Sequence, residues 1–388
     1  MRKGWEYKRL GEIAKCAIGL TYKPENVTEE LSGTIVLRSS NIQNSILDFN
    51  DIVRVNVPVK EDKIVKDGDI LMCSRNGSIR LVGKVALIKN LKERMSYGAF
   101  MTIIRSQYNP YLFEYFKTPA FRQYLIAGKT TTVNQITVKM LNNLTIPLPP
   151  KSTQLAIVSE LDKINELIRL KKEQLKDFDN LAQSLFYEMF GDPVENEKGW
   201  EVKTFGEIGS VERGAGISKK DFVKEGLPCI HYGQLHTILG PRTTKHFTSI
   251  PHNLLPKYKI AHTGDLIMAI TSEDVEGSCK STVWLGDYDI IVGSDAAIFH
   301  HKQDGTFLSY YTMTKAFFNE KAKYAKGFKV THISAKEIEK IPVYLPPLPL
   351  QRLFAQRIEQ IEREKSEVQK SIQDLETLLA SRMQYWFE

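Results

Sequence analysis

The sequence predicts an α+β protein that contains one ancestral unit twice, each copy being a globular domain followed by a long helix. Three observations support this prediction: an apolar stripe that occurs in two distant stretches, short motifs that recur at a constant offset, and short β-branched runs in both globular parts. We expect globular domains at residues 1–150 and 192–347, and helices at residues 151–191 and 348–388.

The first globular domain combines strands with an internal helix. Apolar, β-branched runs at residues 34–37, 69–73, 82–88 and 100–104 lie between Gly and Asp turns and predict strands. The aromatic-rich stretch 111–127 predicts a helix. This mixture is typical of an α+β domain.

The first long helix is predicted by apolar residues that recur at alternating steps of four and three. Such spacing places one narrow stripe on a helix, and the stripe must be buried against a similar one. Pro149 and Pro150 precede the helix and Gly191 follows it, which marks both of its ends. At 1.5 Å per residue the helix would be roughly 55 Å long, which favours a spacer. The expected interface residues are Ile157, Leu161, Ile164, Ile168, Leu175, Phe178 and Leu185.

The second globular domain repeats landmarks of the first at offsets of 195 to 197 residues. Its runs at 265–270, 282–285 and 296–300 predict strands, and the stretch 307–325 predicts a helix. The recurring landmarks are Gly4-Trp5-Glu6 with Gly199-Trp200-Glu201, Gly68-Asp69 with Gly264-Asp265, and Leu148-Pro149-Pro150 plus Gln154 with Leu345-Pro346-Pro347 plus Gln351.

The second long helix carries a stripe in phase with the first, because its stripe positions lie 197 residues after those of the first helix. Two similar stripes in one chain predict that the two helices pack on each other. The expected interface residues are Phe354, Ile358, Ile361, Val368, Ile372, Leu375 and Leu379.

The positive charge of the chain is concentrated in its first part. The formal net charge is +7, and residues 1–150 contain 22 Lys and Arg against 13 Asp and Glu. A concentrated positive field favours a polyanionic partner, although a solvated basic surface would give the same count. The four cysteines form no CxxC pair, and no stretch reaches 18 apolar residues, so we expect a soluble cytoplasmic protein without a membrane partner.

Polar loops after apolar runs supply the candidate nucleic-acid contacts of the first domain. Arg and Lys can bind phosphates, whereas Ser, Thr and Asn can also pair with base edges. An ordinary solvated loop is the alternative for each residue taken singly. The candidates are Arg38, Ser39, Ser40, Asn41, Arg75, Asn76, Arg80, Lys129, Thr131 and Asn134.

Similar places in the second domain carry different residues. All eight histidines of the chain lie in this half, so the two loop sets differ in chemistry on a shared frame. Such divergence is typical of a duplicated reader of two targets, and neutral drift would produce it as well. The candidates are His231, Tyr232, Gln234, His236, Thr271, Ser272, Lys326, Lys329 and Thr331.

The sequence contains no recognisable catalytic, metal or nucleotide site. Gly128-Lys129-Thr130 resembles the end of a phosphate-binding loop, but Gln123 stands where that motif requires Gly. The histidines lack the carboxylate or cysteine spacing of a metal centre, and no Ser or Cys triad is visible. We therefore expect a non-catalytic chain that binds no metal or cofactor.

The combined layout resembles the DNA specificity subunit of type I restriction–modification systems. The resemblance covers essentially all 388 residues and is carried by the two domains, the two in-phase helices, Gly-Trp near each domain start and Leu-Pro-Pro-x-x-x-Gln before each helix. Thr153 and Leu350 stand where that family often has Glu. This departure concerns only the local helix cap.

The resemblance implies that each globular domain is a target recognition domain for one half of a split double-stranded DNA site. It implies that the two helices pair as an antiparallel coiled coil and set the separation of the domains. Two methyltransferase subunits would methylate adenine at N6 with S-adenosylmethionine, and two restriction subunits would use ATP and Mg²⁺. The host would be bacterial or archaeal.

Two other functions remain open on the sequence. A coiled-coil scaffold whose globular domains bind protein partners would show weak, salt-insensitive DNA binding. A free-standing methyltransferase or nuclease would need cofactor-binding or carboxylate motifs that we do not find.

Overall fold

The computed structural model describes residues 4–127, 134–217, 219–252, 258–327 and 330–388. The chain divides into two compact units: unit 1 comprises Met1–Lys172 and Lys370–Glu388, and unit 2 comprises Glu173–Gln369. Each unit includes part of both long helices, α5 (Lys151–Phe190) and α11 (Leu348–Phe387). Unit 1 is therefore made of two separate stretches of the chain, whereas unit 2 is one stretch that begins and ends inside the long helices.

Unit 1 is built on two four-stranded sheets, with strand orders β2-β11-β8-β9 and β10-β4-β7-β3. The first sheet is antiparallel, whereas β10 and β4 pair in parallel. The strands of the two sheets are β2 (Lys15–Ile18), β3 (Val27–Thr28), β4 (Thr34–Leu37), β7 (Arg54–Val55), β8 (Ile70–Cys73), β9 (Val85–Leu87), β10 (Met95–Tyr97) and β11 (Met101–Arg105).

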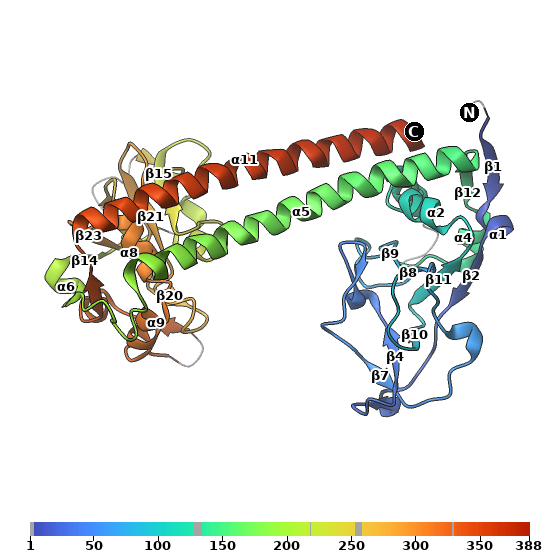
Figure 1. Ribbon diagram of the computed structural model, residues 1–388, viewed down its shortest axis with the longest axis horizontal. Helices are drawn as coiled ribbons and strands as arrows, with labels where there is room; N and C mark the ends of the chain where they lie inside the picture. Colours follow the sequence, from blue (N-terminus) through green and yellow to red (C-terminus); the bar gives the residue numbers. More distant parts are fainter. Residues whose placement is uncertain (1–3, 128–133, 218, 253–257, 328–329) are drawn as a thin grey trace. The chain divides into compact units, whose positions relative to one another are not determined.

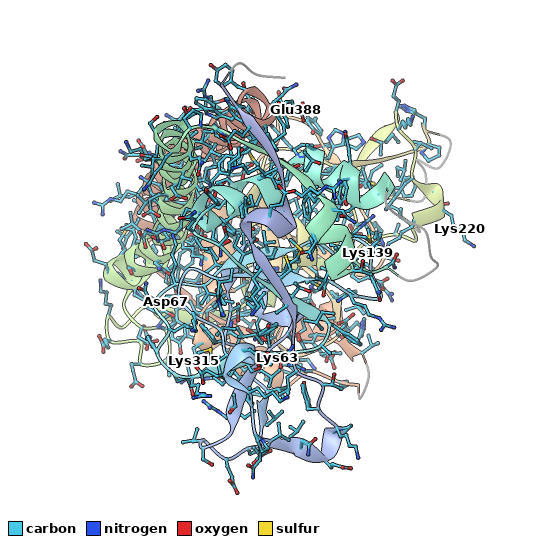
Figure 2. The ribbon with its side chains drawn as sticks, turned by 90° about the vertical axis from the view of Figure 1, so that its right-hand side faces the viewer. Lys63, Asp67, Lys139, Lys220, Lys315 and Glu388 are labelled. Carbon is cyan, nitrogen blue, oxygen red and sulfur yellow. The ribbon has the colours of Figure 1, made fainter. Side chains whose placement is uncertain are left out.

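Smaller elements complete unit 1 (Figure 1). Asp67 and Lys139 are two of its exposed charged side chains (Figure 2). The paired strands are β1 (Glu6–Arg9) with β12 (Thr145–Leu148) and β5 (Ile42–Gln43) with β6 (Ile46–Leu47). The helices are α1 (Leu10–Ile13), α2 (Asn109–Phe116), α3 (Pro119–Ala127) and α4 (Val138–Asn143), and the 3-10 turns are η1 (Pro24–Asn26), η2 (Ser39–Asn41) and η3 (Glu61–Lys63).

The central strand β8 separates two apolar cores in unit 1. Ile70 and Met72 belong to the core that also contains the aromatic residues of α2 and α3. Leu71 and Cys73 belong to the core on the other face. Since successive strand residues point to opposite faces, a strand that is apolar throughout must be covered on both sides.

Unit 2 repeats this plan with a five-stranded sheet, β14-β23-β19-β21-β16, and a four-stranded sheet, β17-β15-β22-β18. Its central strand β19 also separates two cores, with Leu266 and Met268 on one side and Ile267 and Ala269 on the other. The strands are β13 (Glu201–Thr204), β14 (Gly209–Arg213), β15 (Leu227–Ile230), β16 (Arg242–Thr243), β17 (Thr248–Ile250), β18 (Lys259–Ala261), β19 (Leu266–Ala269), β20 (Thr271–Ser272), β21 (Ser281–Trp284), β22 (Ile290–Val292), β23 (Ala296–His301), β24 (Thr331–His332) and β25 (Pro342–Leu345).

The helical elements of unit 2 lie at places similar to those of unit 1. They are α6 (Phe205–Ile208), η4 (Lys219–Asp221), α7 (Tyr232–Thr237), α8 (Gly305–Tyr311), α9 (Lys315–Ala322) and α10 (Ala335–Ile338). The pairing of β1 with β12 recurs in β13 with β25, and the parallel pairing of β10 with β4 recurs in β22 with β15. The predicted fold class, a tandem α+β repeat carried on two long helices, is confirmed.

In unit 1, the C-terminal turns of α11 run antiparallel to the first half of α5 and pack on the globular core. Glu160 of α5 accepts hydrogen bonds from Arg382 and, at 2.9 Å, from Trp386 Nε1. Farther along both helices, Lys172 Nζ lies 2.9 Å from Glu376. Leu379, Met383, Trp386 and Phe387 pack against the core that contains Tyr111 and Tyr115.

In unit 2, the second half of α5 and the first half of α11 also run antiparallel (Figure 1). Phe354 of α11 packs against Phe186 and Phe190 of α5, with ring centroids 5.6 and 5.3 Å apart, and against Tyr310 of α8. Lys365 Nζ lies 2.7 Å from Asp179. The helix pair is thus part of the core of each unit.

Burial along the two helices follows the expected stripe, with one difference at the end of α5. There Phe186 and Phe190 are buried while the expected Leu185 is half-buried, because this end packs on the core of unit 2 as well as on α11. The expected residues that are buried are Ile157, Leu161, Ile164, Ile168, Phe354, Ile358, Ile361, Val368 and Ile372. Those that are half-buried are Leu175, Phe178, Leu185, Leu375 and Leu379.

We predict that Phe354→Ala lowers the free energy of unfolding of unit 2 by about 3–5 kcal/mol, because it opens a cavity among buried rings. The adjacent Leu353 is 42% exposed, so Leu353→Ala is the matched control. It should change stability by no more than about 0.5 kcal/mol. Denaturant unfolding of both variants is followed by tryptophan fluorescence, to which Trp284, buried in unit 2, contributes. Equal stability of the two variants would contradict the packing described.

Candidate nucleic-acid interface

Three polar segments that are distant in the sequence meet on unit 1. Asn76 Nδ2 donates a hydrogen bond of 3.2 Å to Ser39 Oγ, which joins the segment after β8 to the segment after β4. The backbone N–H of Asn76 donates to the carbonyl of Asn134, and Asn134 Nδ2 donates to the carbonyl of Gly77 at 2.9 Å. We call residues 38–41, 74–80 and 134–136 the unit 1 loop cluster.

Arg75 is an exposed cation of the unit 1 loop cluster. It lies between an antiparallel bridge to Gln135 and the ring of Phe100, whose centroid is 5.1 Å from the guanidinium carbon. Arg80 is also exposed, and its carbonyl accepts a hydrogen bond from Arg122 Nη2 at 2.8 Å. Two cations therefore belong to a surface that also carries amide and hydroxyl groups, as nucleic-acid contacts require.

The segment after β4 uses part of its polar groups internally. Asn41 is buried, accepts a hydrogen bond from the Arg38 backbone N–H and donates to the carbonyls of Asp48 and Asp51. Arg38 Nη2 lies 2.7 Å from the Asp51 carboxylate. Asn41 thus shapes the loop, and the charge of Arg38 is partly compensated, whereas Ser39 and Ser40 are half-buried at its surface.

Unit 2 brings together a corresponding set of segments. Thr271 and Ser272 pair with His332 and Thr331 in the short ladder of β20 and β24. His236 Nε2 lies 3.1 Å from the Thr271 carbonyl, and Lys326 forms a bridge with His332. We call residues 231–236, 271–277 and 326–332, as far as the structure describes them, the unit 2 loop cluster. Lys329, like Lys129 and Thr131 of the first half, lies outside the described residues.

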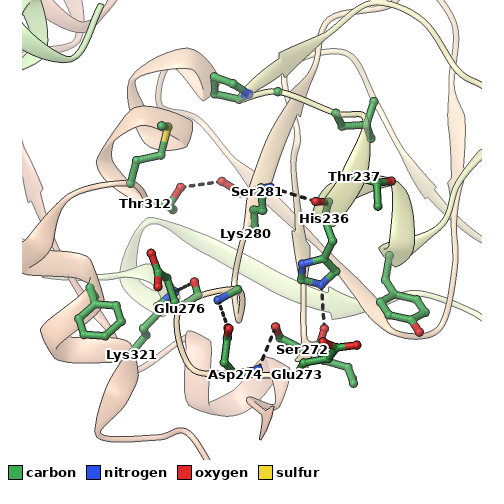
Figure 3. Close-up of a pocket in the computed structure, with 18 of the residues that line it drawn as sticks. His236, Thr237, Ser272, Glu273, Asp274, Glu276, Lys280, Ser281, Thr312 and Lys321 are labelled. Carbon is green, nitrogen blue, oxygen red and sulfur yellow. Dashed lines mark hydrogen bonds between the residues drawn. The ribbon is translucent and has the colours of Figure 1, made fainter. Parts of the chain in front are cut away.

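The unit 2 loop cluster forms one wall of a cleft of about 1190 Å³. Figure 3 shows the His236 ring directed toward the segment that carries Ser272 and Glu273. Tyr232 and Thr271 also line the cleft. The opposite side is lined by residues of α5 and of the α8–α9 connection. Hydroxyl, amide and imidazole groups therefore face a concave surface beside the helix.

A buried lysine, which the sequence did not single out, holds the loop that carries Glu273, Asp274 and Glu276 in place. Lys321 is 4% exposed and donates hydrogen bonds to the carbonyls of Glu276, at 2.8 Å, and of Ser278. Burial lowers the pKa of its ammonium group. Lys280 Nζ likewise donates to the His236 carbonyl at 3.3 Å. Both lysines thus position loops of the cleft.

His231 and Gln234 cap helix α7 instead of facing solvent. His231 Nδ1 accepts a hydrogen bond from the Gly233 N–H at 3.2 Å, and Gln234 Oε1 accepts one from the His231 N–H at 2.9 Å. Both side chains are 9% exposed, and burial lowers the pKa of His231. His231 and Gln234 are buried and hold helix α7 in place. They thereby position Tyr232 and His236, whose side chains line the cleft.

Lys326 is held at the edge of the unit 2 loop cluster by an ion pair with Glu337. The hydrogen bond from Lys326, together with those from the backbone and hydroxyl of Ser334, lowers the pKa of Glu337 to about 2. The carboxylate is thereby kept ionised, and the charge of Lys326 is partly compensated. Thr331 is buried in the ladder with Ser272.

Neither a metal-binding cluster nor a membrane-spanning helix is found in the described ranges. No three His, Cys, Asp or Glu side chains there are grouped so that they could hold a metal ion. None of the described helices is long and apolar enough to cross a bilayer.

Comparison with known proteins gives one consistent result. The model of the type I restriction modification DNA specificity domain matches residues 2–177 and 197–377. The specificity subunit of type I restriction enzyme MjaVIII from Methanocaldococcus jannaschii is 24% identical over 407 residues, covering 97% of this chain and 92% of its own. The EcoKI specificity subunit from Escherichia coli is 25% identical over 203 residues, covering 50% of this chain and 43% of its own.

A solved chain from work on complex assembly and conformational transition of the type I restriction–modification system has the same fold. It aligns with a TM-score of 0.61 and 20% identity, covering 100% of this chain and 98% of its own.

We predict that the stability of unit 2 falls on mild acidification, partly through His231. Because the folded-state pKa of His231 is below its unfolded value, its contribution is complete above about pH 6.5 and is lost as the pH falls below that value. His231→Asn keeps a capping side chain but removes the titration, so the pH dependence should be weaker.

Unfolding free energies at about pH 7.5 and about pH 5.5 test this. His301, whose pKa burial lowers to about 4, should leave a residual slope in the variant. Identical slopes for the wild type and His231→Asn would contradict the role given to His231.

Proposed function

The chain belongs to the type I restriction modification DNA specificity family, and we propose from this that it reads a split, asymmetric DNA site for partner subunits. Each loop cluster would bind one half-site in double-stranded DNA. The observation that carries this proposal is one backbone frame, present twice, with different side chains at its polar loops.

The difference between the two loop sets supports an asymmetric site. After β4 the chain forms the 3-10 turn η2, with Arg38 as its N-terminal cap residue. After the corresponding strand β15 it forms the longer helix α7, with His231 at that place. Readers of base edges differ through such side chains and loop shapes, so one frame can serve two sequences.

The helix pair supports a fixed separation of the half-sites. α5 and α11 are each continuous over 40 residues, which corresponds to roughly 60 Å. A stiff spacer of this kind would hold two DNA-reading domains about one turn of DNA apart, roughly 10 bp from centre to centre. We propose that the pair acts as this ruler.

The chemistry would belong to the partners. We propose that two methyltransferase subunits bind this chain and transfer a methyl group from S-adenosylmethionine to adenine N6, with the target base turned out of the helix. Two restriction subunits that use ATP and Mg²⁺ would complete the complex in a bacterial or archaeal cytoplasm. The two similar helix–domain junctions would offer one kind of partner two similar seats. This chain would be non-catalytic and bind no cofactor.

We expect a split, asymmetric adenine-methylation motif in a host that expresses this chain together with its methyltransferase subunit. Genome-wide detection of N6-methyladenine, with each protein alone as the control, measures it. Methylation by this chain alone would mean that it is itself an enzyme. A folded, assembled complex that leaves no motif would favour the protein-binding scaffold.

We further expect that removing one heptad from the middle of each helix (residues 171–177 and 367–373) shortens the spacer of the motif by about 3 bp, since seven residues span roughly 10 Å. Both helices lose the same length, so the apolar stripes stay in phase. The half-site sequences should not change. An unchanged spacer in an assembled variant complex would argue against the ruler.

A further inference from the structure

Phe100, which the sequence did not mark as a contact residue, is an exposed ring beside the unit 1 loop cluster. It lies in the turn between β10 and β11 and is 57% exposed. A single exposed apolar side chain needs no functional explanation. Its position does, because the Arg75 guanidinium lies over the ring, 5.1 Å from its centroid.

The backbone fixes this pair. The carbonyl oxygen of Phe100 accepts hydrogen bonds from the N–H groups of Ser74 and Arg75, at 2.9 and 3.0 Å, and from Ser74 Oγ at 3.0 Å. The bridge to Gln135 holds Arg75 from its other side. A guanidinium that is oriented in advance loses less entropy when it forms two parallel hydrogen bonds.

Among the described residues, no carboxylate compensates the charge of Arg75. Several other arginines of unit 1 face carboxylates: Arg38 faces Asp51, Arg54 faces Glu93, Arg94 faces Glu61 and Arg105 faces Asp69, at 2.6 to 2.9 Å. Within the described parts of the chain, no carboxylate lies at ion-pair distance from Arg75. Its donors are therefore available to an acceptor outside the protein.

Unit 2 places different chemistry on the same backbone positions. The N–H of Ile270 donates to the Asp295 carbonyl at 3.0 Å, as that of Ser74 does to Phe100. Thr271 pairs with His332 as Arg75 does with Gln135. Thr271 and Asp295 thus correspond to Arg75 and Phe100. A cation over a ring in one unit is replaced by a hydroxyl and a carboxylate in the other.

We propose that Arg75 and Phe100 act together to read a guanine and a neighbouring thymine in the half-site bound by unit 1, an inference that rests on the function proposed above. The planar guanidinium matches O6 and N7 of guanine in the major groove. The ring beside it offers an apolar surface to the C5-methyl group of thymine. Thr271 and Asp295 provide neither a guanidinium nor an apolar ring. Unit 2 would therefore recognise its half-site through other contacts.

Single-atom changes in the DNA test this proposal in the intact complex with methyltransferase. Each guanine of the split site is replaced in turn by 7-deazaguanine, which lacks the N7 acceptor, and each thymine by deoxyuridine, which lacks the methyl group. For the wild type we expect one guanine at which affinity falls about tenfold. At a neighbouring thymine it should fall about three- to fourfold.

The protein variants should remove these effects selectively. Arg75→Ala should bind the 7-deazaguanine duplex and its parent equally. It should keep the salt dependence of the wild type, because losing a base contact leaves the number of neutralised phosphates unchanged. Phe100→Ala should no longer distinguish deoxyuridine from thymine. Tyr7→Ala, which removes another exposed ring of unit 1, is the matched control and should behave as the wild type.

Three results would overturn the proposal. One is a wild-type complex that is insensitive to every replacement in both half-sites. Another is a folded Arg75 variant that loses affinity equally for all duplexes but keeps the 7-deazaguanine effect, since Arg75 would then contact phosphate. A wild-type complex that prefers no DNA sequence would overturn the proposed function as well, which separates the two failures.

Discussion

The antiparallel pairing of α5 with α11 is the constraint on which the rest of the structure depends. It completes the core of each unit with a helix segment that is distant in sequence. In unit 1, Phe387 packs on Tyr111 and Tyr115, with ring centroids 5.7 and 5.9 Å apart, while hydrogen bonds from Arg382 lower the pKa of Glu160. Strand β8 rests on this core through Ile70 and Met72 and ends immediately before Ser74. The position of the polar loops thus follows from the helix pair.

A constant frame with variable polar ends allows one chain to carry two kinds of surface. The strands β8 and β19 are apolar on both faces, so their sequences are restricted by packing. The residues that follow them, from Arg75 and from Thr271, lie at the surface or in a small ladder and are less restricted. Substitutions can therefore accumulate in these residues without a loss of core stability. These are also the residues through which binding specificity would change.

The repeat and the helical stripes were predictable because offset and periodicity can be read directly from the sequence. The loops were less so. Asn41 and His231 were predicted as contact residues because polar side chains follow a strand there, yet such side chains can equally cap a turn, and both are buried as caps.

The juxtaposition of Arg75 and Phe100 depends on the register of β8 with β11, which no local pattern specifies. The correspondence of Phe100 with Asp295 in the second repeat comes from the backbone hydrogen bonds of the structure, and no motif of the sequence marked it. For Gln154 and Gln351, too, the structure adds what the sequence alone does not give. They were visible as a repeated motif, but only the structure gives the reason, since each side chain donates a hydrogen bond to the carbonyl of a preceding proline, Pro149 or Pro346.

The discontinuous make-up of unit 1 has a consequence for biosynthesis. Unit 2 is one uninterrupted stretch, Glu173–Gln369, whereas the core of unit 1 also needs residues of Lys370–Glu388. During translation the domain that emerges first from the ribosome must therefore wait for the last turns of α11, and the domain that emerges second can be completed before it. A nascent chain released before those turns would expose the aromatic residues of α2 that Phe387 covers, and exposed apolar surface of this kind is prone to aggregate.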